Sequence, residues 1–154
     1  MLIVAAMFAG AGVAASAQAA TLSGSIQQSE AFLSTRCFLS LGGLDSGTSI
    51  AFVGGTFSGC SSGTMALGFS PSWTLTFPTA TTFQLADVQE TFTPPASIPI
   101  TDCIYRGGLS GTYSGSSSGG TLMITANSLV KQTGSHALCG TTLTFTGTLT
   151  LTRP

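Results

Sequence analysis

The chain has 154 residues, of which only 6% are charged, and its formal net charge is −1. An average soluble domain is about 25% charged. The four basic residues are Arg36, Arg106, Lys131 and Arg153, and they are scattered along the sequence. Nucleic-acid binding needs clustered lysine and arginine to neutralise phosphates, so this composition argues against a nucleic-acid partner. For the same reason it argues against binding to anionic membrane surfaces.

The N-terminal segment is an expected export signal. Residues 2–20 carry no charge, and the segment ends in the small-x-small triplet Ala17-Gln18-Ala19, after which signal peptidase would cleave. We therefore predict a signal peptide over residues 1–19 and a single secreted β-domain over residues 20–154. The usual basic residues before the apolar stretch are missing, so either the translation start lies further upstream or the signal is atypical. The alternative is a buried helix, which the lack of an amphipathic pattern disfavours.

The cysteines also indicate export. There are four of them, none in a C-x-x-C motif, and only one histidine, so a zinc site is poorly supported. In an oxidising compartment they would form two disulfides, whereas in a reducing one they would be buried thiols. We predict the pairs Cys37–Cys60 and Cys103–Cys139, because consecutive β-units tend to be neighbours in space. The crossed pairings would instead tie the two halves of the chain together.

Strand patterns follow one another along the chain, with no long helical pattern between them. The candidate strands are residues 49–57, 65–69, 73–77, 82–92, 98–105, 109–114, 121–129 and 141–152. Within residues 82–92 the apolar positions change parity, which predicts a β-bulge near Asp87. In residues 141–152 apolar side chains alternate with threonines, the pattern of a half-buried strand. Gly147 takes an inward position in that strand, which predicts a bend or a close approach there.

Turn signals separate these strands. Glycine pairs occur at residues 42–43, 54–55, 107–108 and 119–120, a spacing typical of an antiparallel β-sandwich or a barrel-like sheet. Thr93-Pro94-Pro95 is expected to be a stiff link between two sheets or two groups of hairpins. We therefore predict an all-β fold with one core. The expected core residues are Phe57, Trp73, Leu75, Phe77, Tyr105, Tyr113, Leu122, Ile124, Leu143, Phe145, Leu149 and Leu151.

The residues that could carry catalysis do not form a convincing set. Residues 59–63 and 115–119 both match G-x-S-x-G, but a nucleophile elbow needs a helix after the serine, and no helical pattern follows either match. His136 is expected to be a loop histidine. The carboxylates of Asp87, Glu90 and Asp102 could serve as glycosidase or calcium groups, but we expect them on the surface or paired with Arg106. We predict no catalytic residue, no metal site and no cofactor.

The second half of the chain carries a resemblance to a known group of proteins. The motifs that carry it are, in order, Cys103-Ile104-Tyr105-Arg106-Gly107, Leu109-Ser110-Gly111-Thr112-Tyr113, Leu122-Met123-Ile124, Cys139 and the last strand with its alternating threonines. This order of motifs resembles that of small secreted bacterial β-proteins similar to the alkane-oxidation activator and the biofilm-associated proteins of pseudomonads. The resemblance covers roughly 100 residues, and it implies a cell-surface or matrix role without catalytic residues.

Three functions remain open at this point. The first is a non-catalytic structural or interaction protein of the envelope, matrix or biofilm, which is secreted or held at the cell surface and works by self-association or with other matrix components. The second is a secreted binding module for a small hydrophobic ligand. The third is a secreted hydrolase, which would require His136 to meet Asp102 or Glu90 around a pocket. In each case the expected mature chain has no transmembrane segment and is extracellular or periplasmic.

Overall fold

Residues 17–31 and 33–154 are described by a computed structural model, and the described chain is built from antiparallel strands. The predicted signal peptide, apart from its last three residues, lies outside this part. The strands are β1 (Gln18–Glu30), β2 (Leu33–Asp45), β3 (Ser49–Ser58), β4 (Thr64–Gly68), β5 (Trp73–Thr79), β6 (Thr82–Thr93), β7 (Cys103–Ser116), β8 (Gly119–Lys131) and β9 (Thr142–Thr152). The described residues contain no helix of the length and apolarity that would span a membrane.

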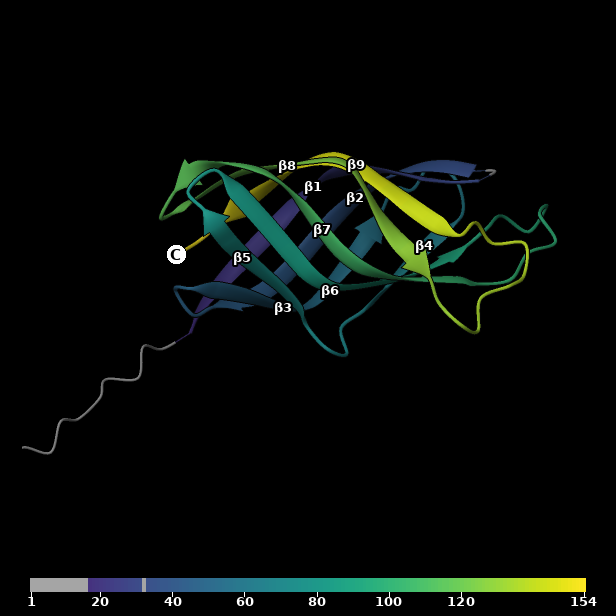
Figure 1. Ribbon diagram of the computed structural model, residues 1–154, viewed down its shortest axis with the longest axis horizontal. Coiled ribbons are helices and arrows are strands. Elements are labelled where there is room, and N and C mark those ends of the chain that lie inside the picture. Colours follow the sequence, from purple (N-terminus) through teal and green to yellow (C-terminus); the bar gives the residue numbers. More distant parts are fainter. Residues whose placement is uncertain (1–16, 32) are drawn as a thin grey trace, which may run out of the picture.

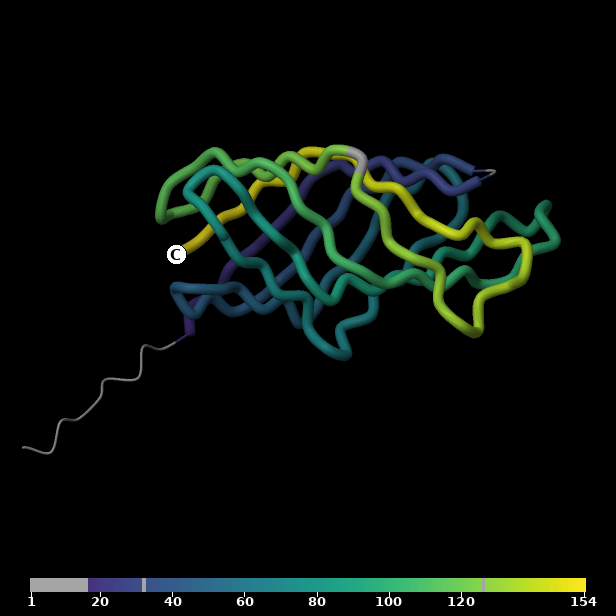
Figure 2. Tube along the Cα trace, in the orientation of Figure 1, coloured from purple at the N-terminus to yellow at the C-terminus, as the bar shows by residue number. Residues whose placement is uncertain are grey.

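The strands form one sheet that closes on itself. Its order runs β6-β5-β3-β2-β1-β9-β8-β7, and β7 pairs in turn with β6 (Figures 1 and 2). The short strand β4 pairs with the second half of β6, whereas β5 pairs with the first half. The expected all-β, antiparallel, barrel-like single domain is therefore confirmed. The described strands form one sheet, and Pro94 and Pro95 lie in the loop that joins its adjacent strands β6 and β7.

The predicted bulge in β6 is present and decides which side chains of this strand face inward. The register of β6 against β7 shifts between Leu85 and Val88, and Asp87 has a φ of 60°. Leu85 points into the barrel before the bulge, while Val88, Glu90 and Phe92 point inward after it. The extra residue thus keeps the apolar positions inside although their parity changes.

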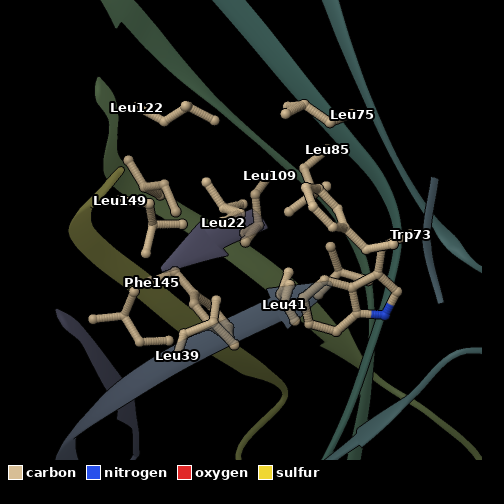
Figure 3. Packing of buried hydrophobic residues seen from close by; sticks show 14 of the residues in the cluster. Leu22, Leu39, Leu41, Trp73, Leu75, Leu85, Leu109, Leu122, Phe145 and Leu149 are labelled. Atoms are coloured by element: carbon tan, nitrogen blue, oxygen red, sulfur yellow. The ribbon is translucent and has the colours of Figure 1, made fainter. Parts of the chain in front are cut away.

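Strand β9 shows the predicted alternation along its whole length. Its leucines and Phe145 are buried, and its threonines lie on the outer side. Side chains from all around the sheet meet these residues and fill the interior (Figure 3). The predicted core residues are buried except for Phe57 and Phe77, which pack against the core from its edge.

Three of the glycine pairs are not turns. Residues 42–43, 54–55 and 107–108 lie inside β2, β3 and β7, and only residues 119–120 follow a turn. A Cβ on Gly43 would lie 2.5 Å from the Ala51 carbonyl oxygen, and one on Gly55 would lie 2.5 Å from the Ser40 carbonyl oxygen. These glycines therefore allow neighbouring strands to approach closely where the sheet bends.

Both predicted disulfides are formed. Cys37–Cys60 ties β2 to the loop after β3, and Cys103–Cys139 ties the start of β7 to the loop before β9. The sequence separations are 23 and 36 residues. Each bond therefore holds a loop against the strand that borders it, and neither is a bridge between separate sheets.

Candidate functional site on the outer wall of the barrel

The two G-x-S-x-G segments are loops that serve the fold. In residues 59–63, the hydroxyl oxygen of Ser61 accepts a hydrogen bond from the Arg36 backbone N–H at 2.9 Å. Residues 115–119 form the end of β7 and its turn into β8. The described chain places no helix after either serine, so neither has the strand-turn-helix geometry of a nucleophile elbow.

His136 and Asp102 lie near each other but do not form a catalytic pair. The His136 backbone N–H donates to the Asp102 carbonyl oxygen at 3.2 Å. The His136 side chain accepts, through Nδ1, a hydrogen bond from the Leu138 backbone N–H at 3.2 Å. The Asp102 carboxylate accepts one from the Thr93 hydroxyl at 2.6 Å. The side chains of His136 and Asp102 are thus each hydrogen-bonded to a neighbouring residue and not to each other. This arrangement stabilises the loops and is not that of a catalytic triad.

Glu90 contradicts the expectation of a surface carboxylate, because its side chain is completely buried. The bulge at Asp87 turns it inward, where its Oε2 accepts a hydrogen bond from Gln28 Nε2 at 2.7 Å. Oε1 of Glu90 and Oε1 of Gln28 have no partner among the described residues. Burial raises the pKa of Glu90 well above its ordinary value, and the Gln28 hydrogen bond offsets only part of this rise. This side chain is therefore a buried carboxylic acid that solvent does not reach.

A second buried polar contact closes the same end of the barrel. The Tyr105 hydroxyl donates to the Glu30 carboxylate, which also accepts from the Gly140 backbone N–H at 3.0 Å. Burial, followed by the neighbouring Glu30, raises the pKa of the Tyr105 phenol. Neither Gln28 nor Glu30 is among the expected site residues, because no strand was expected there. Their shared parity with Leu22 and Ile26 was the signal that would have placed them inside.

Serine and threonine side chains form a regular pattern on the outer wall of the barrel, within the residues that the structure describes. Six exposed or half-exposed hydroxyl side chains lie opposite one another across β3, β2, β1, β9, β8 and β7. They are Thr56, Ser40, Ser23, Thr150, Thr121 and Ser114. A second row crosses β2, β1, β9 and β8 through Ser34, Ser29, Thr144 and Ser128. We call these two rows the hydroxyl wall.

The chemistry of the hydroxyl wall follows from its side chains and their spacing. Neighbouring strands lie about 4.8 Å apart, so the hydroxyls of one row form a ladder of that repeat. Each hydroxyl both donates and accepts a hydrogen bond. Neither row contains a charged residue, so contacts made by the wall would respond weakly to salt. Such a surface suits a partner that is itself uncharged and rich in hydroxyls.

Together, the fold and this surface define a disulfide-bonded, closed antiparallel β-protein with a hydroxyl-covered exterior. Comparison of the chain with protein-family models, with curated proteins and with solved structures gives no match. Within the described residues, His, Cys, Asp and Glu do not gather in any group of three that could hold a metal ion.

Proposed function

We propose that the chain is an exported, non-catalytic interaction protein of the cell surface or extracellular matrix, which binds uncharged, hydroxyl-rich polymers through the hydroxyl wall. The observation that carries this proposal is the row of six hydroxyl side chains in register across six strands. One hydrogen bond contributes only about 1 kcal/mol net. A rigid row of hydroxyls can make several such bonds at once to a repeating polymer, so that weak contacts add up.

Other features of the molecule support this role. Disulfides persist mainly outside the reducing cytosol, and this chain carries two. The interior is filled by large side chains such as Trp73, Phe83 and Phe145, so a chamber for a small apolar ligand finds little support. Of the candidate catalytic groups, His136 and Asp102 are hydrogen-bonded to neighbouring residues and Glu90 is buried, which favours an interaction protein over a hydrolase.

Binding to insoluble polysaccharide tests the proposal. Purified protein is mixed with cellulose or chitin at low and high salt, and the unbound fraction is measured. We expect retention that changes little with salt and that falls in a Thr121→Lys/Thr150→Lys variant, because two lysines would break one hydroxyl row. Thr133→Lys, in an exposed loop, is the matched control and should bind like the parent. Equal retention of all three proteins, or loss of retention at high salt, would contradict the proposal.

Export is tested at the N-terminus. We expect the mature protein to begin at Ala20, which N-terminal sequencing of exported protein would detect. Residues 17–19 are exposed whereas Ala20 is 2% exposed, so cleavage after Ala19 would remove only exposed residues from the described chain. A mature protein that retained residues 2–19 would refute export by this signal.

A further inference from the structure

One end of the barrel, which we call the mouth, holds an arrangement that the hydroxyl wall does not involve. It is formed by the turns β2–β3, β5–β6 and β7–β8 together with Arg153 and Pro154, and the C-terminus marks it in Figure 1. Its backbone is cross-braced: the Arg153 N–H donates to the Ser118 carbonyl oxygen at 2.9 Å, and the Tyr113 N–H donates to the Thr81 carbonyl oxygen at 2.8 Å. These bonds hold the backbone of the turns in place around the mouth.

Arg153 and Asp45 form an ion pair in the mouth. Arg153 donates from Nε to Asp45 Oδ2 at 2.6 Å and from Nη2 to Asp45 Oδ1 at 3.0 Å. The two side chains are 16% and 8% exposed, respectively. The Arg153 hydrogen bond lowers the pKa of Asp45, so both groups stay charged at neutral pH and neutralise each other. These bonds use Nε and Nη2 of the guanidinium, and its Nη1 makes no hydrogen bond to the described residues.

An aromatic surface lies beside this ion pair. The Phe77 and Tyr113 rings are 4.6 Å apart between centroids, and the Arg153 guanidinium carbon lies 5.9 Å from the Phe77 centroid. The Tyr113 hydroxyl is bound to the Ser116 carbonyl oxygen at 2.9 Å, which fixes the ring pair. Phe77 is only partly buried, unlike the aromatic residues at the centre of the barrel. Its ring therefore remains within reach of a ligand.

Phe77, Tyr113 and Arg153 border an open hollow of about 560 Å³, whereas Asp45 does not line it. Its wall includes Thr48, Phe77, Thr79, Tyr113, Ser117 and Arg153. Small-molecule sites have volumes of about 300–1,000 Å³ and combine an apolar surface with a few fixed polar groups. The hollow matches this description in size and in its mixture of aromatic, hydroxyl and guanidinium groups.

We propose that the mouth binds a neutral sugar ring, with Phe77 against its C–H face and with Arg153 and the surrounding hydroxyls bound to its hydroxyl groups. A sugar hydroxyl can accept a hydrogen bond from Arg153 and can both donate to and accept from the threonine and serine hydroxyls of the wall of the hollow. An anion would gain less here, because Asp45 already neutralises the guanidinium. A fully apolar ligand would leave Thr48, Thr79 and Ser117 without partners. This site is separate from the hydroxyl wall and goes beyond the function proposed above.

Isotope-labelled protein titrated with methyl glycosides tests this site. The probes are methyl glycosides of glucose, galactose, mannose and N-acetylglucosamine, together with cellobiose and, as the anionic member, glucuronate. We expect at least one neutral sugar to shift the amide signals of the three turns and of Arg153. Thr48→Trp should abolish these shifts by filling the hollow, whereas Thr133→Trp, in an exposed loop at the other end of the barrel, should leave them unchanged.

A second variant examines the chemistry of binding. Arg153→Lys keeps the positive charge but removes the guanidinium fork, and we expect it to weaken binding about tenfold or more, the effect of losing a charge-assisted hydrogen bond. The proposal is overturned if no neutral sugar shifts these signals, if glucuronate alone binds, or if Thr48→Trp binds like the parent. The hydroxyl-wall variant Thr121→Lys/Thr150→Lys should keep its sugar affinity, so failure of the wall proposal and failure of this one are distinguishable.

Discussion

Replacing Glu90 by glutamine should change how stability depends on pH. Burial keeps the folded pKa of Glu90 well above its ordinary value of 4.5. Above the pKa that Glu90 has in the unfolded chain, the unfolded chain therefore releases a proton that the folded chain retains. The free energy of unfolding then falls as pH rises, by up to about 1.4 kcal/mol per pH unit, until the folded pKa is reached. Below the pKa of Glu90 in the unfolded chain, Glu90 is protonated in both states, and its ionisation no longer lowers the free energy of unfolding.

Glutamine has nearly the same shape as the protonated acid and does not ionise, so the cost of burying it does not change with pH. We therefore expect Glu90→Gln to match the parent near the unfolded pKa of Glu90 and to exceed its stability increasingly toward pH 8. Urea unfolding between pH 4.5 and pH 8, with the disulfides intact, measures the difference. This range avoids acid conditions in which Asp45, whose pKa is lowered, loses its stabilising charge.

Asp87→Asn is the matched control, because Asp87 is an exposed carboxylate in the same strand. Its φ of 60° is one that asparagine also adopts readily. The control should keep the pH slope of the parent. If the stability curves of the parent and Glu90→Gln run parallel over this range, or if Glu90→Gln is less stable throughout, the account of a buried, protonated Glu90 is refuted.

Other predictions concern packing and cross-links, and urea unfolding measures each of them. Phe145→Ala should cost about 3–5 kcal/mol and Thr144→Ala well under about 1 kcal/mol, and similar losses would mean that the inner face of β9 is misassigned. Gly111→Ala should cost about 1–3 kcal/mol because its Cβ would collide with a carbonyl oxygen of β8, whereas Gly42→Ala, whose Cβ meets open space, should be neutral. Replacing both cysteines of Cys103–Cys139 by alanine should cost about 2–5 kcal/mol, and non-reducing peptide mapping of the parent should recover this bond and no crossed pair.

The sequence predicted those parts of the fold in which local pattern and tertiary contacts agree. The last strand was recognisable because every second residue is a threonine and Phe145 keeps the inward phase. The bulge at Asp87 was recognisable because the apolar residues of the strand change there from one alternating set of positions to the other. Both features follow from the two-residue period of a strand, which is a local property.

Other features depended on partners distant in the chain. Strand β1 is not among the predicted strands, and Gly24 and Gln28 interrupt the apolar pattern of its inward positions. Gly24 is required by close contact with β9: a Cβ there would collide with the backbone of that strand at Thr148. Glu90 was assigned to the surface because carboxylates usually lie there, and its partner Gln28 is 62 residues away in sequence. No local pattern predicts such a pairing.

The first and last strands of the described chain are neighbours in the sheet, with Thr21 opposite Thr152. During synthesis at about 5–20 residues per second, β1 must wait for β9 before this edge is paired. Until then the growing chain has an unpaired edge that could capture another strand. Pairing over such a long separation also makes folding slow. We therefore expect the newly made chain to be prone to aggregation until its last strand emerges, and a chain truncated before β9 to remain so permanently.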